Sequence, residues 1–289
     1  MGDFKHYIEL TKPRIGLLVI ITAYLGYYIG LRNIDSYMVQ SDEWVILLHL
    51  LFGMFLSCSG ACVFNQYFER SIDAKMDRTK NRPLPLGQIT PMRAYLFGMF
   101  LFLFSTFYLY FFINTTVAVL SCLTYITYLF IYTPLKQITT LNTLFGSIPG
   151  AIPPVGGWVA ATGNIESPAW ILFGVLVCWQ IPHFLAIAII YSEDYSRGGL
   201  KMLPSVYPDN KLTHAHILFF TIALTFVSLG LYVIKYAGIV YAVGAVLLGL
   251  VFMYYSVRMI KDSSIQNAKR LFYYSIAYLP ILIFLIILS

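Results

Sequence analysis

Long apolar runs, separated by short polar connections, repeat along the whole chain. A helix needs about 20 apolar residues to cross a bilayer, and nine runs reach or approach that length. We therefore predict an all-α membrane protein with nine transmembrane helices, most of them joined as tight hairpins. Period-two alternation of apolar and polar residues is absent, which argues against a channel built of strands. The predicted helices cover 15–32, 44–65, 92–112, 115–133, 141–161, 168–191, 215–234, 238–257 and 271–288.

The composition supports a membrane-embedded chain. Of the 289 residues, 59% are hydrophobic and 11% are charged, and the mean hydropathy is +0.74. Soluble domains carry about 25% charged residues, so a soluble globule, a disordered chain and a nucleic-acid-binding protein are excluded. The four cysteines lie in apolar runs without CxxC spacing, which argues against a disulfide framework or a zinc site. The polar N-terminal stretch argues against a cleavable signal peptide, and residues 1–289 are expected to form one integral-membrane domain.

The basic residues predict the orientation of the chain in the membrane. Of the 19 Lys and Arg residues, all except Arg32 and Lys235 lie on one side of the predicted helices. The positive-inside rule then places the N-terminus in the cytoplasm and the C-terminus outside. The two longest polar connections, 66–91 and 192–214, lie on the cytoplasmic side, where we expect the functional site.

A row of oxygen-bearing side chains, spaced four residues apart, runs from the end of the predicted helix 44–65 into the first long connection: Asn65, Glu69, Asp73 and Asp77. This spacing predicts a stripe on one helical face. Stacked carboxylates repel one another unless a cation lies among them, and hard oxygen ligands beside a phosphate suit Mg²⁺. The alternative is a solvated helix end with ordinary ion pairs. The interleaved basic residues, which could hold phosphate oxygens, are Arg70, Lys75, Arg78, Lys80 and Arg82.

A second polar constellation begins inside the predicted helix 168–191. Gln180 and His183 lie on one face in mid-membrane, and Pro182 predicts a kink. Polar groups at such a depth are commonly functional, although a histidine can also be a packing residue. The loop that follows resembles a smaller metal-and-phosphate patch or, alternatively, a solvated turn. Its charged residues are Glu193, Asp194, Arg197 and Lys201.

The predicted helix 141–161 is rich in glycine and proline. Gly146 and Gly150 form a small-xxx-small face suited to close helix packing. Pro149, Pro153 and Pro154 predict a broken helix, which a membrane protein tolerates beside a cavity or a neighbouring helix.

The polar segments taken together resemble the UbiA-type intramembrane prenyltransferases, which attach isoprenoid diphosphates to aromatic acceptors. NQYFERSIDAKMDRTKNRPLP at 65–85 is similar to the first acidic motif of that family. The whole set, in this order, is most similar to the branch of the family whose acceptor is protohaem IX. The other matching segments are LTKPRIGLLVIITAYLG at 10–26, YTPLKQITTLNTLFGSIPGAIPPVGGW at 132–158, WQIPHF, EDYSRGG and MLP within 179–204, and NAKRLFYYSIAYL at 267–279.

The resemblance implies a role for each polar residue in a UbiA-type bundle that has a polar cytoplasmic cap. Asn65, Glu69 and Asp73 match the N-x3-D-x3-D pattern that binds magnesium and diphosphate, with Glu69 in place of an aspartate. Asp194 matches a carboxylate of the second motif, and these four residues are the expected catalytic set. The expected metal ligands add Asp77 and Glu193, although relatives often carry a base at the Asp77 position. The expected diphosphate-binding residues are Arg70, Lys75, Arg78, Arg82, Lys136, Arg197 and Lys201.

The resemblance also implies the reaction and the substrates. Farnesyl diphosphate would lie with its tail among apolar helices and its head on Mg²⁺, and a vinyl group of haem b would attack carbon 1 of the farnesyl chain. Addition of water then gives haem O, for terminal oxidases. His183 stands where quinone-type relatives carry an acidic residue and could contact the haem iron or a propionate, with Gln180 and Trp179 beside it. The implied location is the bacterial plasma (inner) membrane, with a haem A synthase or terminal oxidase assembly as a candidate partner.

Three other functions fit parts of the sequence. A family member that prenylates a quinone precursor should carry an acidic residue in place of His183. A transporter or channel would not need two acid-and-base patches on one side of the membrane. A phosphatidyl-alcohol transferase would carry the opening motif D-G-x2-A-R, which this chain lacks.

Overall fold

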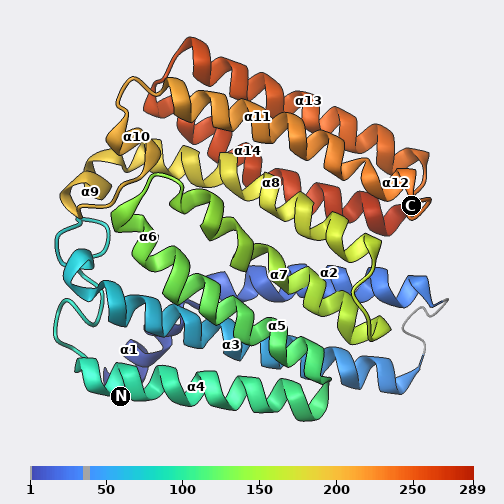
Figure 1. Cartoon of the computed structure of the whole chain (residues 1–289), viewed down its shortest axis with the longest axis horizontal. Coiled ribbons are helices and arrows are strands. Elements are labelled where there is room, and N and C mark those ends of the chain that lie inside the picture. The colour runs from blue at the N-terminus through green and yellow to red at the C-terminus, as the bar shows by residue number, and fades with distance from the viewer. Residues whose placement is uncertain (1, 35–39) are drawn as a thin grey trace. The chain divides into compact units, whose positions relative to one another are not determined.

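The computed structural model describes residues 2–34 and 40–289, and every regular element in these ranges is helical (Figure 1). The chain divides into two compact units. Unit 1 comprises Met1–Pro134, Ile148–Ile165 and Arg197–Gly199. Unit 2 comprises Leu135–Ser147, Glu166–Ser196 and Leu200–Ser289.

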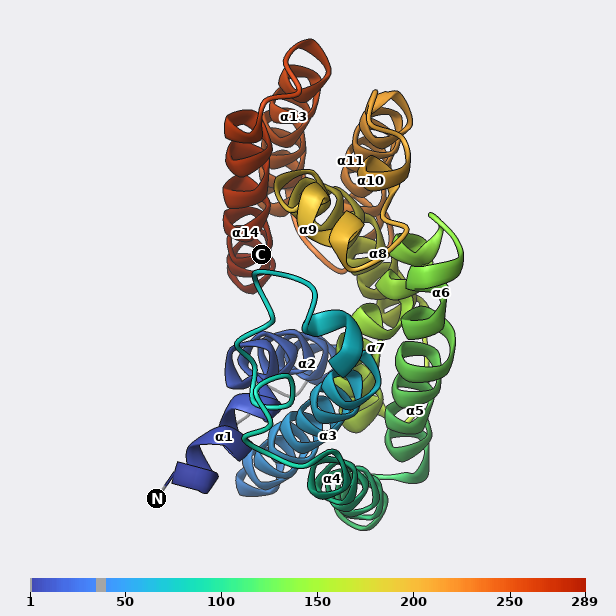
Figure 2. The ribbon, with the colours of Figure 1, turned by 90° about the vertical axis from the view of Figure 1, so that its left-hand side faces the viewer.

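Unit 1 is organised around the long helix α3. This helix packs against α1, α2 and α4, and Figure 2 shows it running between α2 and α4. The helix that follows α4 changes from α to π geometry at η1, so the predicted segment 115–133 comprises three consecutive pieces. The helices are α1 (Gly2–Thr11), α2 (Pro13–Asn33), α3 (Ser41–Asp73), α4 (Pro91–Phe112), α5 (Thr115–Tyr125), the π-helix η1 (Ile126–Tyr132) and α6 (Thr133–Ile138), of which α6 crosses into unit 2.

Side-chain hydrogen bonds cap the N-termini of two of these helices, α4 and α5. Thr90 Oγ1 accepts a hydrogen bond from the backbone N–H of Arg93, and Pro91 occupies the first helical position of α4. Asn114 Oδ1 accepts a hydrogen bond of 2.8 Å from the N–H of Val117 at the start of α5. Each contact satisfies a backbone donor that the first turn of a helix leaves open.

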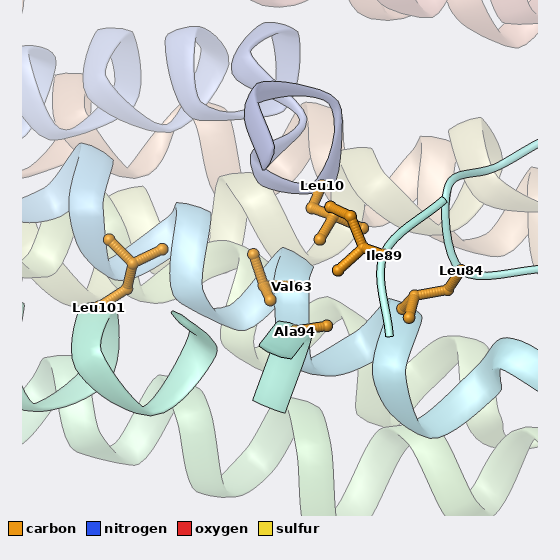
Figure 3. Packing of buried hydrophobic residues seen from close by; sticks show 6 residues of the cluster. All are labelled: Leu10, Val63, Leu84, Ile89, Ala94 and Leu101. Atoms are coloured by element: carbon orange, nitrogen blue, oxygen red, sulfur yellow. The ribbon is translucent and has the colours of Figure 1, made fainter. Parts of the chain in front are cut away.

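A buried apolar cluster fixes the loop that follows α3. Figure 3 shows side chains from α1, α3, α4 and this loop meeting in one contact region. Burying a Leu or Ile side chain contributes about 1.5–3 kcal/mol, so the cluster holds the loop firmly against the helix that carries the first acidic motif. Its members are Leu10, Val63, Leu84, Ile89, Ala94 and Leu101.

Helix α7 (Asn142–Thr162) is continuous through Pro149, Pro153 and Pro154, so the prediction of a broken helix is wrong. Each proline removes one backbone donor but has a φ angle that a helix accepts. In unit 1 the second part of α7 also packs very closely on α2. A Cβ atom on Gly26 would collide with the Pro154 carbonyl oxygen, and one on Gly157 would collide with the Ala23 carbonyl oxygen. Glycine is required at both contacts because the two backbones touch.

Unit 2 contains four long helices, each of which packs against two of the others. Helix α8 packs against α11 and α14, and α13 packs against the same two helices. Buried polar contacts reinforce the bundle: Tyr241 Oη donates to the Ser228 carbonyl oxygen (2.8 Å), and the hydroxyls of Thr221 and Ser256 lie 3.0 Å apart. The helices are α8 (Ser167–Ile190), α9 (Ser192–Arg197), α10 (Leu203–Val206), α11 (Lys211–Ser228), α12 (Gly230–Val233), α13 (Ile239–Lys261) and α14 (Ile265–Leu288), with Arg197 itself assigned to unit 1.

Eight helical spans among the described residues are long and apolar enough to cross a membrane. Many large apolar side chains along them are exposed, as expected where lipid covers the surface. The protein is therefore an integral membrane protein with an all-α fold. The predicted segment 141–161 forms α7, which is absent from the eight because its Pro, Gly, Ser and Thr residues lower its hydropathy. The count of nine crossings and the sides of the two termini remain predictions.

The two long polar connections are shorter than the sequence predicts. Helix α3 continues to Asp73, well beyond the predicted end at residue 65, so the first loop is reduced to 74–90. The second connection contains two short helices, α9 and α10. As a result, most of the first acidic motif lies on a regular helix.

Candidate functional site

Three polar residues of the first motif line the last turns of α3. Asn65, Glu69 and Asp73 follow one another at four-residue intervals, and their exposed fractions are only 3%, 6% and 1%. The predicted stripe on one helical face is confirmed for these three residues. Their burial distinguishes them from a solvated helix end, because water does not cover their polar atoms.

Two atoms of this stripe have no hydrogen-bond partner among the described residues. They are Asn65 Nδ2 and Asp73 Oδ1, and both are buried. A buried polar group without a partner costs about 1–3 kcal/mol. Such groups persist where they bind a ligand, an ion or an ordered water, so the end of α3 has the properties of a binding site.

Arg82 forms an ion pair with the last residue of the stripe. Its Nη1 lies 2.7 Å from Asp73 Oδ2, so Oδ1 is the one oxygen of this carboxylate that has no partner among the described residues. Thr79 Oγ1 donates to the Asp73 carbonyl oxygen at 2.9 Å and draws the loop back onto the helix end. The predicted association of the motif with a basic residue is therefore present for Arg82.

Asp77 does not share the helical face, and this part of the stripe prediction is wrong. Helix α3 ends at Asp73. The Asp73 carbonyl oxygen accepts hydrogen bonds from Thr79 Oγ1 and from the Met76 N–H. In a continuing helix the same oxygen would accept from the Asp77 N–H. Asp77 is 58% exposed and pairs with Lys80 and Arg197, each at 2.6 Å. Exposed ion pairs contribute about 1 kcal/mol or less.

The other basic residues near this loop are exposed. Arg70 donates to the Tyr67 carbonyl oxygen at 2.7 Å and lies over the Tyr67 ring, 4.9 Å from its centroid. Arg197 reaches the loop because Gly198 packs against Met76, whose Sδ lies 3.0 Å from the position of a Cβ at Gly198. Lys75, Arg78 and Lys80 are exposed as well.

In unit 2, Gln180 lies on α8 and links this helix to α7 by a hydrogen bond. It is buried, and its Nε2 donates to the carbonyl oxygens of Ser147 (3.2 Å) and Leu176 (3.0 Å). Both amide N–H groups are therefore used within the protein, and Oε1 is the atom left for another partner.

His183 lies among aromatic rings. Its ring stacks on Trp179 with centroids 4.9 Å apart and planes at 20°, and it contacts Phe272 of α14, also at 4.9 Å. His183 Nδ1 is 2.7 Å from Ser275 Oγ, and Trp179 Nε1 donates to the Ser275 carbonyl oxygen at 2.7 Å. The structure thus brings the predicted Trp179 and His183 together.

The acidic residues of the second motif differ in burial. Asp194, on α9, is 6% exposed, whereas Glu193 beside it is exposed.

Lys136 and Lys201 are joined through their backbones, since the Lys201 N–H donates to the Lys136 carbonyl oxygen at 2.7 Å. Asn142 Nδ2 also donates to the Lys201 carbonyl oxygen, at 2.8 Å.

The donor set fits magnesium better than zinc or another soft metal. Across the part of the chain that the structure describes, no three His, Cys, Asp or Glu side chains gather as a metal-binding group. Magnesium binds through one or two carboxylates, waters and the phosphates of its substrate. The buried carboxylate and amide of Asp73 and Asn65, with Glu69 between them, meet that requirement.

The residues of the first motif and Arg197–Gly199 lie in unit 1, whereas the other residues of the second motif lie in unit 2. The profile of the UbiA prenyltransferase family matches residues 19–280 of the chain, which include parts of both units. The chain belongs to the UbiA prenyltransferase family. The predicted membership of the UbiA-type family is thereby confirmed.

Curated UbiA relatives align with the chain from end to end. A protoheme IX farnesyltransferase from Solibacter usitatus is 41% identical over 287 residues, which cover 99% of this chain and 98% of the relative. A protoheme IX farnesyltransferase from Salinibacter ruber is 39% identical over 283 residues, with 98% of each chain covered.

Solved structures support the UbiA fold. A structure described as providing insights into digeranylgeranylglyceryl phosphate synthase in membranes matches with a TM-score of 0.82 and 20% identity, covering 100% of this chain and 98% of that one. A UbiA homologue from Archaeoglobus fulgidus, bound to DMAPP and Mg²⁺, matches with a TM-score of 0.68 and 15% identity, covering 95% and 99%. At these identities the likeness concerns the fold alone.

Two buried polar residues of unit 2 were not predicted from the sequence as site residues. Ser275 contacts both His183 and Trp179, and Asn142 holds the backbone of Lys201. Ser275 is a polar residue inside an apolar helix, which is itself a signal of function. Which partner it contacts depends on the packing of α14 against α8, and the sequence carries no such information.

Proposed function

We propose that this chain transfers the farnesyl group of farnesyl diphosphate to a vinyl group of haem b, giving haem O and diphosphate. The observation that carries the proposal is its 41% identity, over 99% of its length, to a relative named protoheme IX farnesyltransferase. In the reaction the farnesyl C1–O bond breaks, a bond forms between C1 and the vinyl carbon, and water supplies the hydroxyl group of the product.

The donor diphosphate is assigned to the end of α3. Asn65, Glu69 and Asp73 are the residues that would hold Mg²⁺ through their side-chain oxygens, and the unpartnered Asp73 Oδ1 supports this assignment. The unpartnered Asn65 Nδ2 is a donor and would bind a diphosphate oxygen. Bound magnesium supplies positive charge that stabilises diphosphate as it leaves. Arg82 orients the Asp73 carboxylate through their ion pair, and Asp194 is assigned to the same chemistry from the second motif. Arg70, Lys75, Arg78, Lys136, Arg197 and Lys201 are proposed to contact the diphosphate.

The acceptor haem is assigned to the aromatic surroundings of His183. Trp179 and Phe272 flank the half-buried His183 and give its surroundings an apolar, aromatic character suited to a porphyrin. A site without exposed water also protects the allylic cation from premature quenching. Trp179, His183 and Phe272 all belong to unit 2.

The location of the reaction follows from the charge asymmetry of the loops. We propose that residues 1–289 act as one prenyltransferase domain in the bacterial plasma membrane, with the site facing the cytoplasm. Haem O leaves in the membrane, so a haem A synthase or a terminal oxidase assembly is the proposed recipient.

An acceptor assay tests the function. Purified protein in nanodiscs is incubated with haem b, farnesyl diphosphate and Mg²⁺, and the pigment is analysed by mass spectrometry. We expect a product heavier by one farnesyl group and one hydroxyl group, and loss of that product when EDTA removes the metal.

Other results of the same assay would contradict the proposal. Prenylation of a hydroxybenzoate or naphthoate, with haem b unchanged, would identify a quinone-precursor enzyme. A chain that modifies no acceptor but moves a solute across sealed vesicles would be a transporter.

A further inference from the structure

Ser275 makes three polar contacts that together orient His183 and Trp179. Its Oγ lies 2.7 Å from His183 Nδ1 and 2.6 Å from the Phe272 carbonyl oxygen, and its own carbonyl oxygen accepts from Trp179 Nε1 at 2.7 Å. Ser275 is fully buried on α14, whereas His183 and Trp179 lie on α8. One residue therefore fixes two rings of the neighbouring helix.

The hydrogen-bond geometry determines the tautomer of His183. Ser275 Oγ and the Phe272 carbonyl oxygen are only 2.6 Å apart, a distance at which two oxygen lone pairs repel unless a proton lies between them. A serine hydroxyl has one proton, so that proton points to the Phe272 carbonyl. His183 Nδ1 must then donate its own proton to Ser275 Oγ.

A histidine that donates from Nδ1 keeps a lone pair on Nε2. His183 Nε2 has no hydrogen bond among the described residues, since Nδ1 makes the one polar contact of the ring. The groups around the ring are Trp179, Phe184 and Phe272. In these apolar surroundings the neutral ring is favoured over imidazolium, so Nε2 is a ready electron-pair donor.

We infer that Ser275 is a positioning residue that presents His183 Nε2 as an axial ligand to the iron of the haem substrate. This inference rests on the proposed function. It selects the iron over a haem propionate, because an ionised carboxylate requires a donor and Nε2 in this tautomer is an acceptor. Histidine ligands of metals characteristically donate the other ring N–H to an oxygen, and this second contact sets their orientation and basicity.

Spectral titrations with two porphyrins test the inference. Ferric haem b carries iron and propionates, whereas metal-free protoporphyrin IX carries the same propionates without iron. Each is titrated into the full chain in nanodiscs without farnesyl diphosphate, and the Soret band and Kd are measured. The variants are His183→Ala, Ser275→Ala and Ser275→Thr. Ser256→Ala is the matched control, since Ser256 is equally buried in unit 2 but contacts Thr221.

We expect the substitutions to weaken binding of haem b, which contains iron, much more than binding of metal-free protoporphyrin IX. His183→Ala should abolish the Soret shift of haem b and raise its Kd by about 100-fold, while the Kd of protoporphyrin IX changes less than about threefold. Loss of a group that orients a metal ligand costs about 10–100-fold in affinity, so Ser275→Ala should raise the haem Kd by about tenfold or more. Ser275→Thr keeps the hydroxyl and should restore binding, and Ser256→Ala should behave as wild type.

Two outcomes would overturn the inference while the proposed function stands. An unchanged Soret band in His183→Ala, in protein that still farnesylates haem b, would exclude ligation by this residue. An equal loss of affinity for haem b and protoporphyrin IX would assign His183 to a propionate or to packing. If wild-type protein neither binds nor farnesylates haem b, the proposed function itself fails.

Discussion

Replacing Asp73 by alanine is expected to lower turnover by about two to four orders of magnitude. Asp73 is buried, pairs with Arg82 through Oδ2, and has an Oδ1 atom with no partner among the described residues. Its loss removes one of the proposed oxygen ligands of Mg²⁺ and leaves the Arg82 guanidinium without its counter-ion. Rates of farnesyl transfer at saturating Mg²⁺ measure the effect.

Asn65→Ala is expected to lower turnover to a similar extent, because Asn65 Nδ2 is the other buried atom that lacks a partner. Asp77→Ala provides the matched control on the same segment. Asp77 is exposed and contacts two basic side chains, so its removal should change turnover less than about tenfold. Near-normal activity in both Asp73→Ala and Asn65→Ala would remove the metal site from the end of α3. A loss in Asp77→Ala as large as in Asp73→Ala would extend that site into the loop.

A methyl group added at Gly26 or Gly157 is expected to destabilise unit 1 severely. Each new Cβ atom meets a backbone carbonyl, of Pro154 in one case and of Ala23 in the other. Overpacking against side chains costs about 1–3 kcal/mol, and a backbone relaxes less readily than a side chain. We therefore expect Gly26→Ala and Gly157→Ala to lower Tm by roughly 10 °C or more, measured by thermal denaturation in detergent.

Gly238→Ala is the control for that experiment. The nearest atoms to a Cβ at Gly238 belong to Ser289 and lie 3.9 Å away, which is an ordinary contact, so Tm should stay within a few degrees of wild type. If Gly26→Ala and Gly157→Ala melt at the wild-type temperature, α2 and α7 do not pack through their backbones.

The sequence determined the class of protein and the position of the chemistry along the chain. The bilayer requires long apolar segments, and such segments can be counted in any sequence, so the helical membrane fold followed directly. The four-residue spacing of Asn65, Glu69 and Asp73 is equally local, and α3 preserved it as a buried stripe. The resemblance to the UbiA family also depended on residues and their order alone.

The tertiary structure decided where each pattern ends and which partners the side chains meet. Asp77 continued the spacing in the sequence, but Thr79 Oγ1 and the Met76 N–H take the Asp73 carbonyl and end the regular helix before Asp77. Three prolines predicted a break in α7, yet the helix is continuous against α2. The pairing of Ser275 with His183 spans 92 positions. Contacts of this kind depend on how helices pack, and periodicity along a single segment carries no information about its neighbours.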